Sequence, residues 1–346
     1  MVEMTEARFA SILQGFSQVS VAVVGDYFLD KYLIIDPDLT EPSLETGLDA
    51  FQVVDRRISP GAAGTVISNL HALGLSDIHA VGVTGRDGEA FELRQGLSAW
   101  DVNMEHLLEH ADVFTPTYTK PMIKQPDGGE EEGNRIDIVN RDPLPEEIQR
   151  AVIEGTEACL AGVDAVIIAD QVEDAALGVI TPQVRAALCE MAQAHPGCVF
   201  FADSRAHIAD FRHMLIKPNE REGARAVGIE DDAGDEAIAA ALYKKTGRPV
   251  FLTLGDEGMV VYDGSDFARV PAYTVSGLTD IVGAGDSATA AIVPAICSGA
   301  SPAEAAVFGN IAASITVQQI GTTGTASPQQ MRKRFVEYTA ACGGES

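Results

Sequence analysis

Residues 280–291, which read DIVGAGDSATAA, place two glycines and two aspartates ahead of a run of small residues with a helical pattern. Gly283, Ala284 and Gly285 lack bulk, so the backbone can turn sharply there and direct several N–H groups at one point. The helix that follows adds the positive end of its dipole. Asp286 stands at the edge of this anion site, where it can accept a proton from a hydroxyl group attacking a phosphoryl group. The stretch predicts a site for phosphoryl transfer.

Two other interpretations compete with this one. An aspartate near the start of a helix is commonly only a cap. In addition, GAGDSA fits the dinucleotide fingerprint G-x-G-x-x-A. That fingerprint requires an apolar strand directly before it and an acidic residue about 20 residues later, at the end of a second strand. Here VSGLTDIV is a poor strand and the later region has a helical pattern, so the sequence disfavours a dinucleotide site.

The elements around this stretch alternate between strand and helix. Continuous apolar runs bounded by turn residues are typical of strands buried on both faces. They cover Val19–Gly25, Ile78–Val83, Val163–Asp170, Cys198–Asp203, Val250–Leu254 and Met259–Asp263. Helical patterns cover Ala62–Leu73, Glu89–Trp100, Pro145–Leu160, Thr181–Ala194, Glu236–Thr246, Asp286–Ser298, Pro302–Gln319 and Pro328–Ala341. This order predicts an α/β fold with an open, mostly parallel sheet between two layers of helices.

Two regions interrupt the alternation. Residues 32–58 are mixed in polarity and contain Pro37 and Pro42, and residues 113–139 show two strand patterns around the turn QPDGGEEEGN. We expect both to leave the main sheet and to form a small β flap that covers the site. The apolar residues Ile34, Ile35, Phe51, Val53 and Val54 give this flap an apolar face. Because an exposed apolar face is costly, we expect a homodimer to form through the flap.

Composition excludes several classes of protein. The 346 residues include 24 Lys and Arg against 51 Asp and Glu, a net charge of −27, which disfavours nucleic acid and anionic membranes as partners. The five cysteines show neither the spacing of a zinc site nor a disulfide framework. No secretory leader and no apolar run long enough to span a membrane is apparent. A cytoplasmic protein is therefore expected.

Several motifs resemble one family. DIVGAGD is similar to the D-T-x-G-A-G-D signature of the ribokinase-like, or phosphofructokinase B, family of carbohydrate kinases. KPNERE (217–222) resembles the family's P-N-x-x-E element, and TLGDEGMVVYD (253–263) resembles its T-x-G-x-x-G turn. VVGDYFLDKY (23–32) and SPGAAGTVISNLHALG (59–74) look like the sugar-side elements. The resemblance implies a three-layer α/β/α kinase domain over residues 1–346 with a β lid, and ATP and Mg²⁺ as cofactors.

Within the family, the sequence looks most like the kinase part of the bifunctional ADP-heptose synthases. The shared features are GD-x-x-x-D-K-Y, an Asp-Ser-Arg before KPN-x-x-E, and Thr117–Ile123 followed by RIDIVNRD. This branch phosphorylates a heptose phosphate. No nucleotidyltransferase pattern follows up to Ser346, so the second activity of those proteins is not expected.

The resemblance also implies roles on the nucleotide side. Asp286 would be the base, and Gly283 to Gly285 would hold the transferring phosphate. Asn219 and Glu222 would organise Mg²⁺ and its waters, although their spacing also fits a cap at a helix start. Thr253, Gly255, Gly258 and Asn310 would border the nucleotide, although a tight strand connection also explains the glycines. Asp280 and the carbonyl of Ile281 would help to bind K⁺ behind the anion site.

On the sugar side, Asp30 would accept hydrogen bonds from sugar hydroxyl groups, with Asp26 as the competing candidate that could instead fix the turn. Gly61 and Ala62 would let the sugar approach closely. The chain departs from the family here, because Ala62 replaces a usual glycine and Thr65 replaces a usual asparagine. The flap also has PSLETG (42–47) where P-E-A-P is common. These departures leave the identity of the sugar open.

The predicted function is transfer of the γ-phosphoryl group of Mg-ATP to a hydroxyl of a sugar or sugar phosphate. A phosphorylated acceptor would need cations, and the flap-side candidates are Lys31, Arg56, Arg57, Lys120 and Arg135. The alternatives are a kinase of nucleosides or other small alcohols with the same fold, and a catalytically silent sensor of nucleotide or sugar. Pro294 should bend the helix that follows Asp286.

Overall fold

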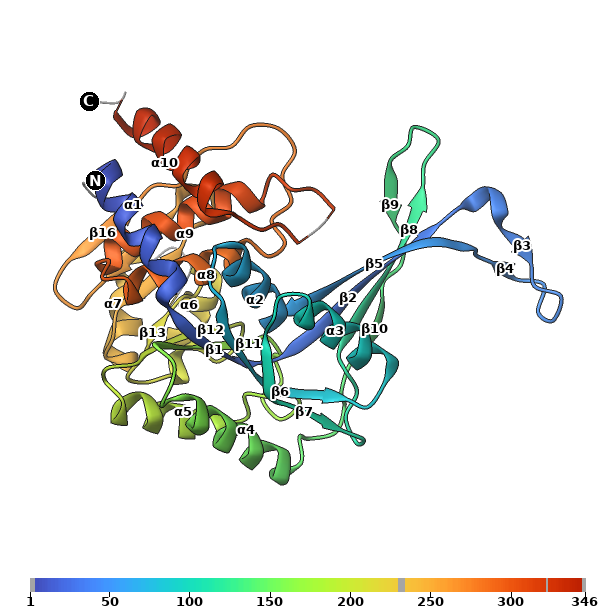
Figure 1. The fold of residues 1–346 in the computed structure, drawn as a ribbon, viewed down its shortest axis with the longest axis horizontal. Helices are drawn as coiled ribbons and strands as arrows, with labels where there is room; N and C mark the ends of the chain where they lie inside the picture. The colour runs from blue at the N-terminus through green and yellow to red at the C-terminus, as the bar shows by residue number, and fades with distance from the viewer. Residues whose placement is uncertain (1–3, 230–233, 322, 344–346) are drawn as a thin grey trace.

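The computed structural model describes residues 4–229, 234–321 and 323–343 (Figure 1). The helices are α1 Glu6–Gly15, α2 Ala63–Ala72, α3 Gly88–Ser98, α4 Glu146–Cys159, α5 Pro182–Ala194, α6 Glu220–Val227, α7 Asp235–Thr246, α8 Ala284–Cys297, α9 Pro302–Thr316 and α10 Pro328–Gly343. The strands are β1 Ser20–Gly25, β2 Tyr27–Ile35, β3 Glu41–Pro42, β4 Asp49–Ala50, β5 Val53–Ala62, β6 Asp77–Gly85, β7 Asn103–His110, β8 Thr117–Lys124, β9 Glu130–Glu132, β10 Ile136–Ile138, β11 Ala165–Asp170, β12 Val199–Ser204, β13 Leu215–Ile216, β14 Val250–Thr253, β15 Met259–Tyr262 and β16 Phe267–Val270. Within these ranges, no helix has both the length and the apolar character needed to cross a bilayer.

The main sheet is mostly parallel. Within the described residues it has nine strands in the order β16-β15-β14-β13-β12-β11-β1-β6-β7. Every pair from β14 to β7 is parallel, and only β15 and β16 join antiparallel at one edge. In such a sheet the carboxyl ends of the strands lie along one edge, where ligands bind. The topology therefore fixes where to look for a site.

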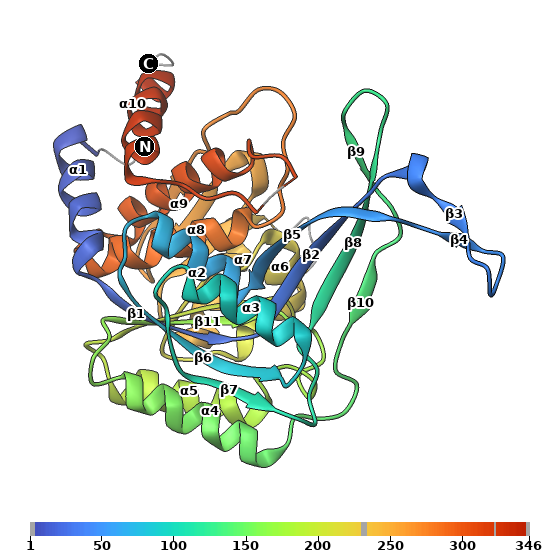
Figure 2. The same cartoon turned by 45° about the vertical axis from the view of Figure 1, so that its right-hand side comes forward.

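Both faces of the sheet are covered. Along β1, Val21 and Val23 face one apolar cluster while Ala22 and Val24 face the other, because side chains alternate along a strand. Helices α1, α2, α3, α8, α9 and α10 contribute to the first cluster, and α4, α5, α6 and α7 to the second. Figure 2 shows α4 and α5 on one side of the sheet and α2, α3 and α8 on the other. The predicted three-layer fold is confirmed.

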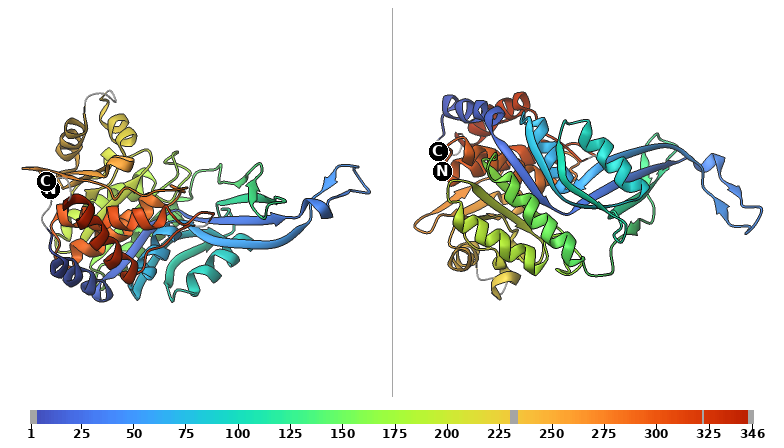
Figure 3. Two further views of the ribbon diagram at one scale, coloured as in Figure 1. Left: turned by 90° about the horizontal axis from the view of Figure 1, so that it is seen from above. Right: turned by 60° about the horizontal axis from the view of Figure 1, so that its bottom comes forward.

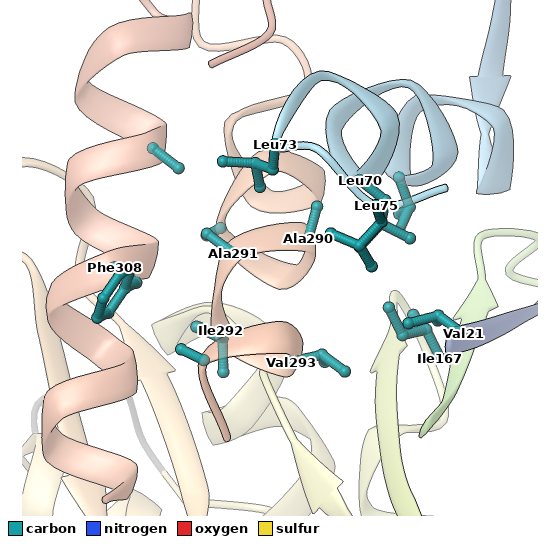
Figure 4. Close-up of a cluster of buried hydrophobic side chains, with 14 of the residues drawn as sticks. Val21, Leu70, Leu73, Leu75, Ile167, Ala290, Ala291, Ile292, Val293 and Phe308 are labelled. Carbon is teal, nitrogen blue, oxygen red and sulfur yellow. The ribbon is translucent and has the colours of Figure 1, made fainter. Parts of the chain in front are cut away.

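Helix α8 is the innermost helix of its layer. Its residues Ala290, Ala291, Ile292 and Val293 are completely buried, between Phe308 of α9 and the apolar side chains of α2 (Figure 4). Small residues allow α8 to pack this closely against its neighbours. The helix continues through Pro294, which is itself buried. The buried residues 287–295 thus anchor the helix whose first turn includes Asp286.

A second sheet extends from the body as an arm, which we define as residues 27–62 and 117–138. Strand β2 pairs antiparallel with β5 and parallel with β8, and β8 also pairs with β9 and β10. The arm projects far from the body, with β3 and β4 at its tip (Figures 1 and 3). Its strands reach beyond the predicted excursion 32–58, since β2 begins at Tyr27 and β5 ends at Ala62, whereas β8, β9 and β10 lie within the predicted excursion 113–139. Glu130–Glu132, inside the predicted turn, is the short strand β9.

All six predicted strands of the main sheet and all eight predicted helices are present. Sequence patterns did not predict α1, α6, β7, β13 and β16. Strand β7 lies at the sheet edge with exposed and partly buried residues and one buried residue, Leu107, and β13 has only two residues. Edge strands and very short strands lack the continuous apolar run that identifies a buried strand. The omitted strands therefore have a common physical cause.

The expectation of an apolar face on the arm needs correction. Ile34 and Ile35 are buried, and Ile34 packs with Tyr32 and Met122 inside the arm. Phe51, Val53 and Val54 are exposed as expected. The other exposed apolar side chains of the arm are Leu39, Leu44, Leu48, Ile58 and Ile136. The exposed apolar surface thus lies mainly toward the tip, since the base of the arm uses its isoleucines internally.

Ala62, where β5 meets α2, has φ 53° and ψ −116°. This backbone conformation is one that glycine adopts easily and that residues with a Cβ atom rarely adopt. The family's usual glycine at this position therefore has a conformational reason. Ala62 introduces strain of about 1–3 kcal/mol, the usual cost of such an outlier.

We predict that Ala62→Gly stabilises the protein. Relief of the strain should exceed the added entropy of the unfolded chain, for a net gain of about 1 kcal/mol in the free energy of unfolding. Urea denaturation would measure this gain. The matched control is Ala63→Gly, one residue later in α2, which should be destabilising because Ala63 is buried in a helix. A loss of stability in both variants would contradict the strain at Ala62.

Candidate active site

Two clefts open beside the first turn of α8, at the carboxyl ends of the parallel strands. The larger has a volume of about 560 Å³. Its lining residues are Gln171, Asp203, Arg205, Lys217, Asn219, Glu222, Thr253, Gly255, Gly258, Met259, Ile281, Val282, Gly283, Ala284, Gly285, Asp286, Ala288, Asn310 and Ala313. All residues predicted to border a nucleotide are among them. The structure therefore brings together residues that are far apart in the sequence, as expected of a cleft at the ends of parallel strands.

The smaller cleft, about 280 Å³, lies between the body and the arm. Its lining residues are Phe28, Asp30, Ala62, Thr65, Tyr118, Lys120, Arg135, Gln171, Arg205, Val282, Gly283, Asp286 and Thr323. The two clefts share Gln171, Arg205, Val282, Gly283 and Asp286. Asp286 thus stands where a group in one cleft would meet a group in the other.

The anion site is built at the start of α8. Gly283 is the N-cap, with φ 78° and ψ 0°, and it makes no side-chain cap hydrogen bond. A Cβ atom at Gly283 would approach the methyl groups of Thr323 and Thr65 to 3.2 and 3.4 Å. Asp286 is the third residue of the helix rather than its N-cap. The capping interpretation of Asp286 is therefore wrong, and its carboxylate is left to face the cleft.

The backbone amides of this turn differ from one another. The N–H of Ala284 donates to the carbonyl of Ile281 at 3.2 Å, so it is already used. In the described part of the chain, the N–H groups of Gly285 and Asp286 have no protein acceptor. First-turn amides of this kind bind anions. No strand precedes the turn within residues 271–282, which removes the dinucleotide interpretation.

A buried ion pair lies beside the anion site. Lys217 follows β13 and is 4% exposed, and its Nζ atom lies 2.8 Å from Asp203 at the end of β12. Burial by itself would lower the pKa of Lys217, but its charge interaction and hydrogen bond with Asp203, together with the charges of Glu222 and Asp286, hold that pKa above its ordinary value. Lys217 is also close to Gly285, because a Cβ atom there would lie 3.4 Å from Nζ. The site therefore contains a fixed positive charge.

Asp286 has an unusual acidity. Burial raises its pKa to about 7, and the nearby charge of Asp203 adds to this effect, while Lys217 and Arg205 act in the opposite direction. Perturbed groups of this kind are typical of functional sites. A carboxylate with a pKa near neutrality is suited to accept a proton.

Asn219 and Glu222 form a capping box at the start of α6. The Asn219 side chain accepts a hydrogen bond from the N–H of Glu222, and Glu222 Oε2 accepts one from the N–H of Asn219, both at 2.9 Å. The capping alternative is thus real, yet both side chains also line the larger cleft. Burial raises the pKa of Glu222, as does Asp203. The cap fixes both side chains where they face the cleft.

These residues fit a Mg²⁺ ion that arrives with a triphosphate. Among the described residues, no group of three His, Cys, Asp or Glu side chains could enclose a metal ion. Mg²⁺ is usually held by one or two carboxylates together with water and substrate phosphates, so a closed protein cage is not required. Glu222 and Asp203 supply carboxylate oxygens and Asn219 an amide oxygen on one wall of the cleft. The donor set therefore suits a hydrated Mg²⁺ ion.

The remaining nucleotide-side residues are structural as well as cleft-lining. Asn310 is 5% exposed and donates from Nδ2 to the carbonyls of Val270 (2.9 Å) and Pro271 (3.1 Å), so it holds the loop after β16. Gly258 has φ 102°, and a Cβ atom there would collide with the Val270 carbonyl. Thr253 pairs with Asn219 as an isolated bridge.

The residues predicted to bind K⁺ lie directly before the anion site. The N–H of Asp280 donates to the carbonyl of Val317 at 2.8 Å, and Asp280 Oδ1 accepts from the N–H of Val282 at 3.1 Å. The carbonyl of Ile281 accepts the Ala284 N–H. Asp280 lines neither cleft, whereas Ile281 lines the larger one. The two residues thus form hydrogen bonds within the turn that leads into α8.

Asp26 and Asp30 have different surroundings. Asp26 is 3% exposed and accepts hydrogen bonds from three backbone N–H groups, those of Gln171 (2.8 Å), Val172 (3.1 Å) and Val179 (2.8 Å). It lines neither of the two clefts beside α8, so its placement matches the alternative of fixing the turn. Asp30 lines the smaller cleft, where a Cβ atom at Gly61 would approach its Oδ2 atom to 2.6 Å. Gly61 is therefore needed beside Asp30.

Only two of the five flap-side cations line the smaller cleft. Lys120 Nζ lies 3.5 Å from Asp30 and 3.2 Å from the hydroxyl of Tyr32. Arg135 lies over the Tyr118 ring at 4.1 Å and pairs with Asp137. The other three are directed elsewhere: Lys31 and Arg56 pair with Glu92, and Arg57 pairs with Glu130. The expectation that Lys31, Arg56 and Arg57 contact a phosphorylated acceptor is therefore wrong, because these carboxylates hold them outside the cleft.

Sequence reasoning assigned no role to Gln171, Asp203, Arg205 and Lys217, which line the larger cleft. Each stands at or just after the end of a parallel strand, and a polar residue there is a signal that the sequence contains. The Asp203-Ser204-Arg205 and KPN motifs mark the family resemblance, but neighbouring residues alone do not show what they face. Their convergence requires the order of β11, β12 and β13 in the sheet.

An anion site at a helix start, a carboxylate with a pKa near 7 and two joined clefts define an α/β phosphotransferase. The model of the pfkB family of carbohydrate kinases matches residues 30–330, and the chain belongs to this family. It is a carbohydrate kinase.

Curated relatives include the bifunctional protein HldE of Azorhizobium caulinodans, 30% identical over 313 residues that are 87% of this chain and 61% of that protein. The bifunctional protein HldE of Gluconobacter oxydans is 28% identical over 96% of this chain and 67% of that protein. The chain thus spans about three fifths to two thirds of the length of these relatives.

Solved structures with the same fold include Arabidopsis thaliana ribokinase complexed with ribose and ATP, with a TM-score of 0.63 and 19% identity, covering 91% of this chain and 98% of that one. Another is phosphofructokinase-2 from Escherichia coli in complex with potassium, with a TM-score of 0.70 and 19% identity, covering 93% and 99%. At this identity the likeness concerns the fold.

We predict that Asp286 titrates near pH 7, which can be tested through stability. A carboxyl whose pKa is raised in the folded state stabilises the protein fully below the unfolded pKa of about 4, and this contribution is lost as pH rises through about 7. Asp286→Asn has no carboxyl group at this position to ionise, so its stability should not contain this pH-dependent loss. The melting temperature of the variant relative to the original protein should therefore increase between pH 5 and pH 8. A difference that stays constant over this range would contradict the raised pKa.

Proposed function

We propose that this chain transfers the γ-phosphoryl group of Mg-ATP to a hydroxyl group of a sugar phosphate, with Asp286 as the general base. The observation that supports this most strongly is the junction of the two clefts at Asp286 and the anion site. A nucleotide in the larger cleft would direct its terminal phosphate at the first turn of α8. An acceptor in the smaller cleft would direct a hydroxyl at the same point.

The step follows from this arrangement. The acceptor oxygen forms a bond to the γ-phosphorus as the bond from that phosphorus to the β,γ-bridging oxygen breaks, and ADP leaves with the electron pair. The hydroxyl proton passes to the carboxylate of Asp286. The backbone N–H groups of Gly285 and Asp286 and the ammonium of Lys217 face the charge that develops on the transferring group. When bound, Mg²⁺ would neutralise phosphate charge, and Asn219, Glu222 and Asp203 would hold it.

The acceptor side favours a sugar that already has a phosphate group. With a net charge of −27, the protein as a whole repels anions, so an anionic acceptor depends on local cations. Lys120 and Arg135 line the smaller cleft, as does the shared Arg205. Asp30 would accept hydrogen bonds from hydroxyl groups beside them. The motifs shared with the ADP-heptose synthases make a heptose phosphate the first acceptor to test.

A panel of acceptors tests this assignment. ADP release by the purified protein would be measured with Mg-ATP and matched pairs of sugars and sugar phosphates, including heptose phosphates, together with nucleosides. We expect the highest kcat/KM with a sugar phosphate, at least about tenfold above the free sugar, as one good charge-assisted contact provides. Equal or better turnover of the unphosphorylated sugars would overturn the phosphate preference.

One observation favours a second candidate, a nucleoside kinase. Phe28 and Tyr118 line the smaller cleft with their ring centroids 5.2 Å apart in an edge-to-face arrangement. Such a pair could pack against a nucleobase. The cations of the same cleft oppose this assignment, and the nucleosides in the panel decide between the two.

No release of ADP with any acceptor would instead favour the catalytically silent sensor, which Asp286 and its surroundings argue against.

A monovalent cation is a further part of the proposal. Asp280 and the Ile281 carbonyl would bind K⁺ behind the anion site and draw its backbone into shape. The phosphofructokinase-2 of Escherichia coli, which has the same fold, was solved in complex with potassium. Activity compared in K⁺ and in a bulky organic cation at equal ionic strength would show whether the same holds here.

The arm is the proposed dimerisation surface. Its exposed apolar residues, including Leu44, Leu48 and Phe51, would be covered in a homodimer formed through the arm. A monomer seen by light scattering at micromolar concentration would exclude that dimer and leave the role of the arm as a lid in place.

We also propose a cytoplasmic location, where ATP is available.

We predict that Asp286→Asn lowers kcat by at least about a hundredfold, since general-base catalysis typically provides 10²–10⁴-fold. Binding of ATP should persist, because the first-turn amides and Lys217 remain. Steady-state kinetics and nucleotide titration would measure both effects. Asp142→Asn is the matched control, since this exposed carboxylate lines neither cleft, and it should retain full activity. Turnover of Asp286→Asn within about threefold of the original protein would refute the base.

A further inference from the structure

Arg205 occupies an unusual place among the arginines of this chain. It follows β12 directly and lines both clefts, whereas Lys120 and Arg135 line only the smaller one. Its backbone is fixed on both sides: its N–H donates to the carbonyl of Asp170 at 3.1 Å, and its carbonyl accepts a hydrogen bond from Arg225. The guanidinium group therefore extends from a rigid strand end into the junction between the clefts.

The side chain of Arg205 is positioned by a neutral amide rather than by a carboxylate that would neutralise its charge. Its Nε atom donates to the amide oxygen of Gln171 at 3.2 Å. Within the described residues, no carboxylate lies within 4 Å of Arg205, although Arg57 and Arg135 each pair with one. In a chain with 51 acidic residues, an arginine held by an amide retains its full charge for a ligand. Its two terminal amino groups remain available for an anion.

The positive charge of Arg205 affects ionisable groups in both clefts, as expected for a residue that lies between them. Burial raises the pKa values of Asp286, Glu222 and Tyr118, and the charge of Arg205 lowers all three. Glu222 lines only the larger cleft and Tyr118 only the smaller one. Lys217, the other cation near α8, is already committed to Asp203 at 2.8 Å.

We propose that Arg205 is a catalytic residue that binds the phosphoryl group during its transfer, and that Gln171 is the positioning residue that holds it. This inference rests on the proposed kinase function and assigns a further residue to it. A planar guanidinium donates two parallel hydrogen bonds to phosphate oxygens, and negative charge develops on those oxygens as the group passes from ADP to the acceptor oxygen. Because the hydrogen bond to Gln171 orients the guanidinium group before the reaction, the Arg205 side chain needs little reorganisation at the moment of transfer.

Kinetics separate this role from simple binding of a phosphate that the acceptor already has. Arg205→Gln should lower kcat by at least about a hundredfold, with KM for ATP and for the acceptor changed by less than about threefold. Arg57→Gln, the same change at an arginine that lines neither cleft, should leave kcat unchanged. A raised KM for the phosphorylated acceptor with kcat preserved would overturn the inference, as would a kcat within about threefold of the original protein.

A binding experiment tests the same role without an identified acceptor. ADP and Mg²⁺ would be titrated with and without aluminium fluoride, which mimics the transferring phosphoryl group. Aluminium fluoride should tighten ADP binding to the original protein and to Arg57→Gln, and Arg205→Gln should lose at least about a hundredfold of that tightening while binding ADP alone equally well. Equal tightening in Arg205→Gln would overturn the role of Arg205 alone. No tightening in the original protein would overturn phosphoryl transfer itself, and the inference with it.

The role of Gln171 is tested by a double-mutant cycle. Gln171→Leu removes the acceptor for Arg205 Nε and should lower kcat about tenfold. In the Arg205→Gln background the same change should have no further effect, because there is no guanidinium left to position. Fully additive losses in kcat would show that Gln171 acts independently of Arg205 and would overturn its positioning role.

Discussion

Lys217 and Asp203 join the ends of two neighbouring strands by an ion pair that is largely removed from water. Around it stand Glu222 and Asp286, so without Lys217 the described lining of this cleft would have three carboxylates against the single charge of Arg205. Removing one partner of a buried pair typically costs about 3–5 kcal/mol, because the other charge is left uncompensated. The pair therefore does more than connect β12 to β13. It sets the electrostatic balance in which Asp286 has a pKa near 7 and an anion can still be bound.

The two sheets contribute to different clefts. The main sheet and its helices hold the larger cleft, where the first turn of α8 is open to the cleft and the buried residues 287–295 of the same helix anchor it. The arm supplies Phe28, Asp30, Tyr118, Lys120 and Arg135 to the smaller cleft. Because the acceptor would be contacted by an element that projects from the body, acceptor specificity could change in the arm without disturbing the anion site. The departures from the family pattern lie on that side.

The strong negative charge makes each unpaired cation informative. Most basic side chains of the arm are neutralised in pairs, including Lys31 and Arg56 with Glu92 and Arg57 with Glu130. Arg205, at the junction of the clefts, forms no such pair within the described residues. Phosphate groups would be attracted there by local contacts rather than by the field of the whole protein.

The sequence by itself determined the layers of the fold and the chemistry of α8. Continuous apolar runs identify strands buried on both faces, and GAGD identifies a helix start that binds an anion, because both depend on residues adjacent in the chain. Only the tertiary structure decided that Asp286 is not a cap, that Asp26 is held by three backbone N–H groups, and that Ile34 and Ile35 are buried. It also decided which cations face the acceptor and that Arg205 meets Gln171. These outcomes depend on the order of strands in the sheet and on pairing across long crossovers, for which near neighbours in the sequence provide no signal.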